Sequence, residues 1–386
     1  MKFHDLKNIV SNSELSDIFA VHSKEGDISS DDVVAALLNH SERKKYIDLF
    51  LSIAQSSTHE KASGLVGKLV KKLHKYEGND KMQLWDKTVA SLYSKLKTQE
   101  SLDKSAKDKQ LPEAKKLVDS STFKLSQLGN EYQKIIADKK YLESISKAIK
   151  NFTRIKKDDS SFDFVSFQGF EFAFSSLPKS PEKAKKYMES VLEKGGTLFV
   201  SCHESTEAAT KCRDFWKNEL VLKSGLNGAS VVKITEEILQ TSLVKNSAQK
   251  TPQLIESTLE LDDGRKISHI HFDGWIDRSG CPDDVLLNVL LKRMDELSPD
   301  PRWPKAINCH GGVGRTGEVA YNYLIRKHIE DQIQHSQKEI GDIEVNVPKL
   351  ISDLRQYREL STSGYHITQV YSSTDAYFQR LVQSKK

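Results

Sequence analysis

The sequence predicts an α/β fold in which a mixed, twisted sheet is flanked by helices and preceded by an all-helical N-terminal region. After about residue 118, short runs rich in β-branched and aromatic residues alternate with amphipathic helical patterns, which is typical of an α/β domain. Residues 1–117 show almost no strand pattern and are rich in Lys, Ser, Glu and Leu. We therefore predict a helical region over 1–117 and a second domain, which carries the chemistry, over 118–386.

Length and composition restrict the class of protein. The chain has 386 residues, of which 37% are hydrophobic and 29% charged, and its formal net charge is +4. This mild charge does not predict nucleic-acid binding. The longest apolar stretches are far shorter than the roughly 20 residues of a membrane-spanning helix, and the N-terminus does not resemble a cleaved signal peptide. The four cysteines form no CxxC pair and no disulfide framework, so we expect a reducing, cytoplasmic-type compartment.

The first third of the chain contains an amphipathic stripe. Its apolar residues follow helical spacing: Leu65, Val66, Leu69, Val70 and Leu73. A bundle helix explains this pattern best, and contact of its basic face with a membrane or a partner is the alternative. The charged segment 103–116 is predicted to be a linker or an exposed helix.

Beyond residue 118 each element is predicted from its periodicity. Residues 123–150 have apolar positions near helical spacing. Strands are predicted over 162–174, 197–202, 229–234, 258–261 and 266–272. Amphipathic helices are predicted over 181–194, 283–297, 316–334, 347–360 and 368–382. The Asp-Gly pair at 263–264 predicts a hairpin between the last two strands, because it tolerates the positive φ of tight turns.

One short segment combines a reactive thiol with anion-binding groups. A predicted strand over 305–307 runs into Cys309, a glycine-rich turn, Arg315, and a helix that begins near Thr316. Glycines at 311, 312 and 314 let the backbone curl so that N–H groups point inward, and the helix adds its positive N-terminal end. Such a cradle binds a tetrahedral dianion, and a guanidinium can form hydrogen bonds to two oxygens of that anion.

The same surroundings predict a nucleophile. A helix N-terminus and a neighbouring cation favour the thiolate form of a cysteine, so Cys309 is the candidate. A buried structural cysteine before an ordinary turn is the alternative, but it leaves the spacing to Arg315 unexplained. A Walker phosphate loop requires Lys before Ser or Thr, and Arg315 occupies that place.

Residues 269–282 supply a candidate acid. A predicted strand ends there in a loop that contains glycines and a proline, and Asp277 follows the large aromatic Trp275. An Asp on a lid can protonate a departing phenolate and then activate water as a base. Metal binding by His269, His271 and Asp273 is the alternative interpretation, but no other ligand cluster accompanies them.

These motifs resemble those of the cysteine-dependent protein tyrosine phosphatase family, over roughly residues 118–386. The Cys309-x5-Arg315-Thr-Gly loop resembles its central motif, and residues 269–277 resemble its acid loop. Residues 163–178 resemble its strand pair and the turn that follows, and residues 210–216 resemble a segment whose lysine neighbours the active site. The resemblance implies a tyrosine phosphatase type of sheet. It also implies a metal-independent hydrolase without a cofactor, which dephosphorylates phosphotyrosine in proteins through a phosphocysteine intermediate.

The resemblance also implies roles for individual residues. Cys309 attacks phosphorus, and the phosphoryl oxygens are held by Arg315 and the loop backbone, namely His310, Gly311, Gly312, Val313 and Gly314. Asp277, carried by the loop of Trp275, is the acid and then the base. The hydroxyl of Thr316 eases departure of the thiolate.

The remaining implied residues surround this centre. Lys211 adds positive potential, Gln369 is the candidate for the water-positioning glutamine, and Phe152 is the candidate for the aromatic that walls the phosphotyrosine cleft. Two positions depart from the family pattern, because Asn308 replaces the usual His before the Cys and Ile276 replaces the lid proline.

Two other functions remain open. A phosphoinositide or inositol phosphate substrate is one, although Gly311, Gly312 and Val313 do not supply the extra lysines of such relatives. The other is a non-catalytic phosphotyrosine-binding module, although Cys309, Arg315 and Asp277 are all present.

A phosphatase domain behind an unrelated helical region is also similar to effector phosphatases that pathogenic bacteria inject into host cells. This resemblance implies a virulence role in the host cytoplasm. It further implies that residues 1–117 bind a delivery chaperone or a host partner.

Overall fold

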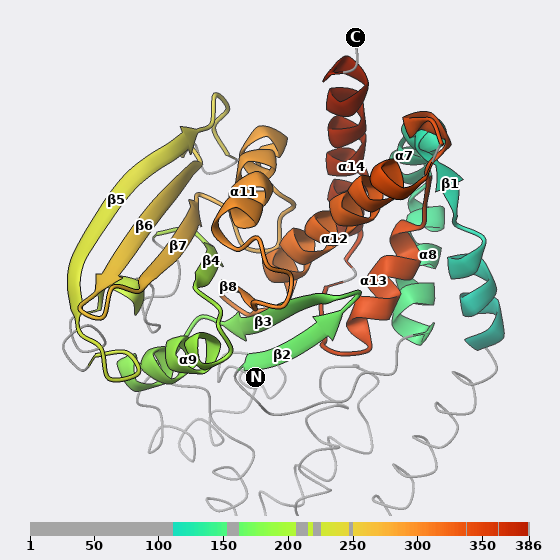
Figure 1. Cartoon of the computed structure of the whole chain (residues 1–386). Helices are drawn as coiled ribbons and strands as arrows, with labels where there is room; N and C mark the ends of the chain where they lie inside the picture. Colours follow the sequence, from blue (N-terminus) through green and yellow to red (C-terminus); the bar gives the residue numbers. More distant parts are fainter. Residues whose placement is uncertain are drawn as a thin grey trace, which may run out of the picture. The chain divides into compact units, whose positions relative to one another are not determined.

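The computed structural model describes residues 111–152, 162–205, 215–218, 225–246, 250–336, 338–361 and 363–384, excluding the side chains at 151 and 152. Gln110–Lys386 forms one compact unit (Figure 1). The helical region predicted over 1–117, with its stripe from Leu65 to Leu73, lies almost entirely outside the described residues.

A seven-stranded mixed sheet forms the centre of this unit. Its spatial order is β2 (Phe162–Phe167), β3 (Phe170–Ser176), β8 (Lys305–Cys309), β4 (Leu198–Cys202), β7 (Lys266–Asp273), β6 (Gln253–Leu261) and β5 (Val231–Thr241). Strand β8 is parallel to both of its neighbours, and β4 is parallel to β7. The remaining neighbouring strands are antiparallel, namely β2 with β3, β5 with β6, and β6 with β7. The prediction of a mixed sheet flanked by helices is confirmed.

Helices and one small sheet complete the described unit. A helix over residues 111–119 comes first and overlaps the predicted linker or exposed helix over 103–116. The helices that follow are α7 (Leu128–Ala137), α8 (Lys139–Phe152), α9 (Pro181–Glu193), α11 (Asp284–Leu297), α12 (Gly314–His335), α13 (Val347–Arg355) and α14 (Gly364–Ser384). Short 3-10 helices are η1 (Leu125–Gln127), η2 (Phe215–Lys217) and η3 (Ile340–Asp342). Strands β1 (Phe123–Lys124) and β9 (Glu344–Val345) pair antiparallel beside them.

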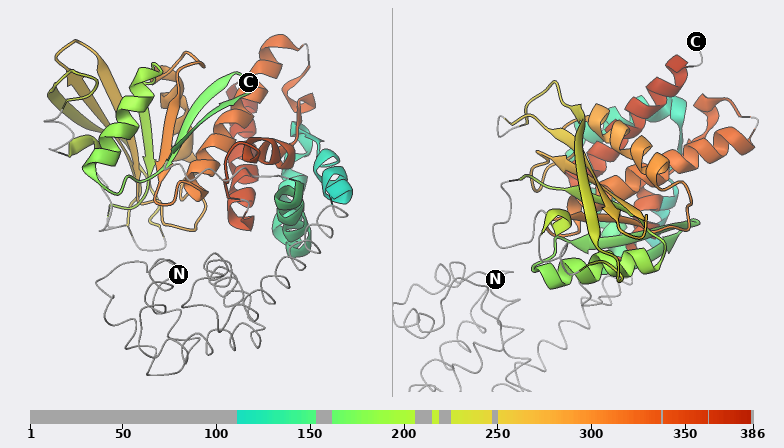
Figure 2. Two further views of the ribbon diagram at one scale, coloured as in Figure 1. Left: turned by 90° about the horizontal axis from the view of Figure 1, so that it is seen from below. Right: turned by 60° about the vertical axis from the view of Figure 1, so that its left-hand side comes forward.

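Helices cover both faces of the central sheet (Figures 1 and 2). On β3, Phe172 and Phe174 belong to the core that α11, α12, α13 and α14 share, whereas Ala173 between them belongs to the core beneath α9. On β4, Val200 and Phe199 divide in the same way. This follows from the alternation of side chains along a strand. The two buried faces explain why the central strands are mostly apolar, with buried polar exceptions such as Lys305 and Asn308 on β8.

One predicted element requires correction, and the expected pair of strands within residues 163–178 is confirmed. Residues 123–150 do not form one helix, because the chain pairs as β1, turns through η1 and then breaks between α7 and α8 at Asp138 (φ −111°, ψ 89°). The Asp138 carboxylate accepts a hydrogen bond from Tyr141 N at 3.0 Å, as the cap of a new helix does. Residues 162–174 form a hairpin, because Gln168 and Gly169 both have positive φ (51° and 81°), which a type I′ turn requires.

Other elements were predicted with small errors. The hairpin between β6 and β7 is confirmed, with Gly264 at φ 84°. Strand β5 continues to Thr241, well beyond the predicted end at residue 234.

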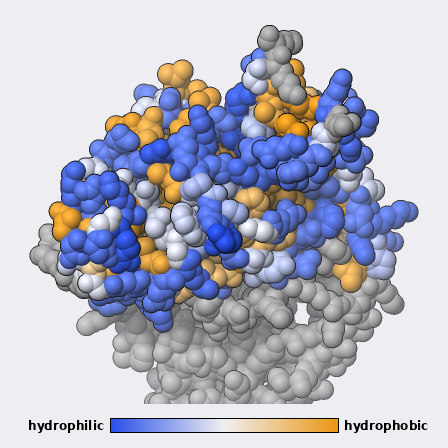
Figure 3. All heavy atoms as spheres, viewed as in Figure 1, coloured by the Kyte–Doolittle hydropathy of each residue, from blue (hydrophilic) through white to orange (hydrophobic). Residues whose placement is uncertain are grey.

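The surface shown in Figure 3 is mainly hydrophilic, and its apolar side chains form separate groups. No helix in the described ranges is long and apolar enough to span a bilayer.

Candidate active site

The candidate nucleophile lies at the end of a central strand. Cys309 is the last residue of β8, and its Cα partners are Ser176 on β3 and Cys202 on β4. Because these strands are parallel, their carboxyl ends meet at one edge of the sheet, where open α/β sheets bind ligands. Cys309 is 2% exposed. The strand therefore places the thiol at the base of the loop that follows it, residues 310–314.

The loop after Cys309 curls tightly because of its glycines. Gly312 has φ +67°, and a Cβ on it would lie 2.5 Å from the backbone of Ser175 and Ser176. A Cβ on Gly314, where α12 begins, would lie 2.7 Å from His366 Nε2. By contrast, a Cβ on Gly311 would meet nothing within 4 Å. The curl thus depends on Gly312 and Gly314, while Gly311 faces open space.

Neighbouring segments hold the carbonyl groups of this loop. The Cys309 carbonyl accepts hydrogen bonds from Leu177 N (2.9 Å) and Gly312 N (3.2 Å). Arg358 Nε donates to the Gly312 carbonyl at 3.3 Å, and Ser361 N donates to the Val313 carbonyl at 3.1 Å. These bonds fix the peptide planes, as a preorganised anion cradle requires.

Arg315 connects the loop to the segment that carries the candidate acid. Its side chain is 1% exposed. Nη1 donates to the Trp275 carbonyl at 2.6 Å, and Nη2 donates to Asp277 Oδ1 at 3.1 Å. The structure therefore brings Arg315 and Asp277, predicted from separate motifs, into contact at the cradle.

The segment from Gly274 to Gly280, here called the lid, is built on fixed ends. Gly274 has φ +81°, and a Cβ there would lie 2.9 Å from Pro252 Cα. Its carbonyl accepts a hydrogen bond from Asn246 Nδ2 at 2.8 Å. Trp275 is fully buried, whereas the Asp277 side chain is 55% exposed. The lid is thus anchored by its buried tryptophan, while its carboxylate is exposed to solvent.

Polar and thiol groups around Cys309 are buried. Thr316 is fully buried, and its Oγ1 has no hydrogen-bond partner among the described residues. Burial raises the pKa of the Cys202 and Cys281 thiols well above their ordinary value. Cys202, which lies opposite Cys309 on β4, and Cys281, which follows the lid, therefore remain neutral thiols at physiological pH.

The two strand histidines contact protein groups. His269 Nε2 lies 2.8 Å from Ser201 Oγ, and its ring stacks on Trp216 at a centroid distance of 3.4 Å. His271 Nε2 lies 3.1 Å from the His203 carbonyl. Burial lowers the pKa of both histidines. No group of three potential metal ligands occurs in the part of the chain that the structure describes.

The structure also identifies a buried pair that the sequence did not indicate. Glu318 Oε2 lies 2.6 Å from His366 Nδ1, and Glu318 Oε1 accepts from Cys281 N at 2.7 Å. The pKa of Glu318 is raised overall, because the effect of burial exceeds the opposing effect of the hydrogen bond with His366. The pair is separated by 48 positions, so no local sequence pattern joins it.

The other predicted residues fall elsewhere. Gln369 lies on α14, where its Nε2 donates to Asp284 Oδ1 at 2.9 Å. Its Oε1 lies 3.2 Å from where a Cβ on Gly280 of the lid would be. Lys211 and the side chain of Phe152 lie outside the described residues.

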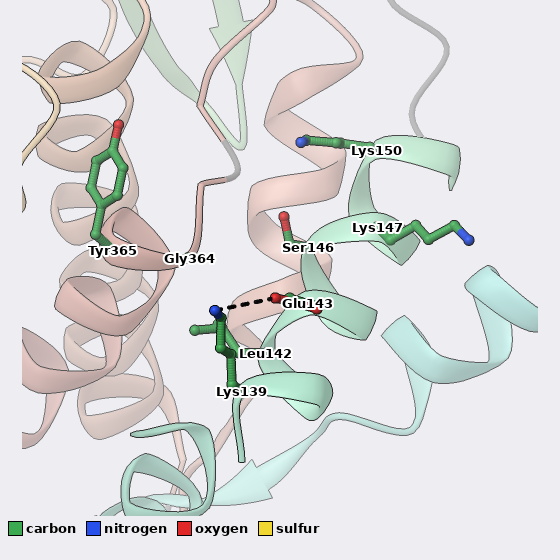
Figure 4. Close-up of a pocket in the computed structure, with 8 residues that line it drawn as sticks. All are labelled: Lys139, Leu142, Glu143, Ser146, Lys147, Lys150, Gly364 and Tyr365. Carbon is green, nitrogen blue, oxygen red and sulfur yellow. Dashed lines mark ion pairs between the residues drawn. The ribbon is translucent and has the colours of Figure 1, made fainter. Parts of the chain in front are cut away.

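A groove of about 510 Å³ lies between α8 and the start of α14 (Figure 4). Its lining residues are Lys139, Leu142, Glu143, Ser146, Lys147, Lys150, Gly364 and Tyr365. Lys139 pairs with Glu143 at 4.0 Å, and Lys147 points away from Tyr365. Because lysines outnumber the one glutamate in this lining, the groove carries a net positive charge, which favours the approach of anions.

Comparison with known proteins identifies the family. No curated protein matches the chain significantly. A family model described as protein-tyrosine phosphatase matches residues 164–373, more than half of the chain. The matched range contains Cys309, Arg315 and Asp277, and the last two are hydrogen-bonded to each other. The chain therefore belongs to the protein-tyrosine phosphatase family.

Proposed function

We propose that this protein hydrolyses phosphotyrosine in proteins through a phosphocysteine intermediate. The observation that carries the proposal is the convergence of Cys309, Arg315 and Asp277 at one end of β8. A thiol next to a helix N-terminus and a cation is a favoured nucleophile, and the guanidinium of Arg315 can bind two phosphoryl oxygens.

In the first step the Cys309 sulfur forms a bond to phosphorus while the bond from phosphorus to the phenolic oxygen breaks. Arg315 and the backbone of residues 310–314 stabilise the charge on the three other oxygens. Asp277 gives its proton to the departing oxygen, so that tyrosine leaves as a neutral phenol. Its contact with Arg315 and the exposure of its side chain support this role.

In the second step a water oxygen forms a bond to phosphorus and the phosphorus–sulfur bond breaks. Asp277, now a carboxylate, takes a proton from this water. The thiolate leaves with a hydrogen bond from Thr316, whose buried hydroxyl has no partner in the described ranges. Gln369 is proposed to orient the water, since its Nε2 is fixed by Asp284 and its Oε1 lies beside the lid.

The substrate-binding proposals extend beyond the described residues. Trp275 anchors the lid, Lys211 adds positive potential, and Phe152 walls a cleft deep enough for phosphotyrosine. Residues 1–117 are proposed to bind a delivery chaperone or a host partner, on the basis of the resemblance to injected effectors alone.

The test compares wild type and Cys309→Ser on a phosphotyrosine peptide and on inositol phosphates, in the presence of a chelator. We expect wild type to release phosphate from the peptide, and Cys309→Ser to bind the peptide without turnover. Normal hydrolysis by Cys309→Ser would contradict the proposed nucleophile. Faster release from inositol phosphates would favour the alternative substrate, and binding without release by wild type would favour the non-catalytic module.

A further inference from the structure

Glu318 is a carboxylate buried within the helix that follows the cradle. It is fully buried and lies three residues after Arg315 on α12. Removing a carboxylate from water is unfavourable unless its oxygens are bonded. Both oxygens of Glu318 have partners, Cys281 N at 2.7 Å and His366 Nδ1 at 2.6 Å. These two partners therefore indicate which parts of the structure Glu318 holds in place.

The first partner is the residue that follows the lid. Arg315 and Glu318 are three positions apart and so share one face of α12. Arg315 Nη1 holds the carbonyl of Trp275 near the start of the lid, and Glu318 holds the N–H of Cys281 at its end. Asp277 lies between these two attachments. One face of α12 thus fixes both ends of the segment that carries the acid.

The second partner reaches the cradle itself. With Nδ1 bonded to Glu318, His366 directs Nε2 to within 2.7 Å of the Cβ position on Gly314. His366 is 2% exposed, whereas its neighbour Tyr365 lines the groove toward α8 (Figure 4). The ring is therefore wedged between Glu318 and the cradle.

We propose that Glu318 is a positioning residue that holds the lid, and with it Asp277, in register with the cradle, and that His366 orients Glu318. The inference rests on the proposed function, because it requires Asp277 to be the acid. Loss of Glu318 displaces the end of the lid and leaves the Cys281 N–H without its acceptor. Proton delivery to the leaving group then suffers, while attack by Cys309 does not.

The leaving group distinguishes this role from a merely structural one. Phosphotyrosine requires protonation of its oxygen, whereas the phosphate ester of a strongly acidic fluorinated phenol does not. We expect Glu318→Ala to lower kcat/KM about 10–100-fold on a phosphotyrosine peptide and less than about threefold on the activated ester. Glu318→Gln retains a carbonyl acceptor for Cys281 N and restores most of the activity on the peptide.

Two further variants keep the experiment decisive. Glu318→Ala can fail to fold, because it leaves His366 and Cys281 N unpaired in the interior. The double variant Glu318→Met/His366→Leu replaces the pair with apolar groups, which proteins often tolerate, and we expect the same selective loss. Val319→Ala, at a buried residue next to Glu318 whose apolar side chain cannot form a hydrogen bond to the lid, loosens the helix and lowers activity on both esters in equal proportion.

Asp277→Ala separates failure of this inference from failure of the proposed function. If Asp277→Ala lowers activity selectively on the peptide but the Glu318 variants do not, Glu318 does not position the acid. Equal losses on both esters in the Glu318 variants would overturn the inference in the same way. If Asp277→Ala itself shows no selectivity for the leaving group, the proposed acid is wrong.

Discussion

Arg315 contacts Asp277 and the Trp275 backbone through two different nitrogens of one buried guanidinium. Nη2 lies 3.1 Å from the Asp277 carboxylate, and Nη1 lies 2.6 Å from the Trp275 carbonyl. An anion that enters the cradle competes with the carboxylate for Nη2, whereas the bond to the carbonyl remains. The acid therefore opposes binding of the substrate that it later protonates.

Asp277→Ala separates these two effects. We expect kcat on a phosphotyrosine peptide to fall about 10²–10⁴-fold, because the general acid is lost. In a Cys309→Ser background the same substitution makes the peptide bind about two- to fivefold more tightly, because Arg315 loses a competing anion. Titration calorimetry measures this change. Arg278→Ala is the control, since Arg278 is 88% exposed and lies 3.9 Å from Asp277; tighter binding in both variants would contradict the explanation.

The glycines of the cradle offer a matched pair of substitutions. Gly312→Ala places a Cβ 2.5 Å from the Ser175 and Ser176 backbone at a φ of +67°. We expect its free energy of unfolding to fall by about 2–4 kcal/mol, because strain and overlap add. Gly311→Ala meets nothing within 4 Å and changes stability by less than about 0.5 kcal/mol. Urea unfolding checks both, and equal losses would show that the crowding does not determine the effect.

Lys305, at the start of β8, is a buried amine. It is fully buried, and its Nζ has no hydrogen-bond partner in the described part of the chain. The ring of Tyr323 lies 5.5 Å away. Burial lowers the pKa of Lys305 to about 8. We expect Lys305→Met to raise the free energy of unfolding at pH 7 by about 1–3 kcal/mol, because a poorly satisfied polar group is removed.

The pH dependence of this stabilisation has a defined sign. Between pH 8 and 10.5 the unfolded chain keeps the Lys305 proton that the folded protein releases. The contribution of this group to stability therefore rises with pH in that window. The advantage of Lys305→Met over wild type should shrink from pH 7 to pH 10 in thermal unfolding. A constant difference would show that the lysine charge is not its cause.

Gln369→Ala tests the proposed orientation of water. We expect slower breakdown of the phosphocysteine and unchanged formation, so that a burst of phenol precedes a lower steady rate. Ser373→Ala is the control, because Ser373 also donates to Asp284 Oδ1, at 2.7 Å, but is not proposed to touch the water. If the two variants behave alike, Gln369 serves only to hold Asp284.

The sequence was most informative where function depends on contiguous residues. Cys309, the glycines and Arg315 lie within seven positions, so their chemistry can be recognised without a fold. The hairpin at Gly264 was predictable for the same reason, since Asp-Gly determines its turn. In contrast, the turn residues at Gln168 gave no signal, because glutamine rarely adopts positive φ, and only the resemblance to the family's strand pair indicated that β2 and β3 pair.

Contacts between distant segments could not be predicted. Glu318 and His366 look like ordinary helical residues in the sequence, and only the packing of α14 against α12 brings them together. The break at Asp138 was missed because its flanks both carry helical periodicity. The burial of Lys305 was likewise hidden, because a lysine at the start of a strand usually remains in water.

The position of β8 has a consequence for how the protein fails on heating. The strand is bonded to β3 on one side and to β4 on the other. Its amide protons therefore exchange with deuterated solvent through opening of the sheet, not through fraying at an edge. Thermal inactivation should accordingly coincide with global unfolding. Cys309 should keep its position in the sheet when only the lid moves.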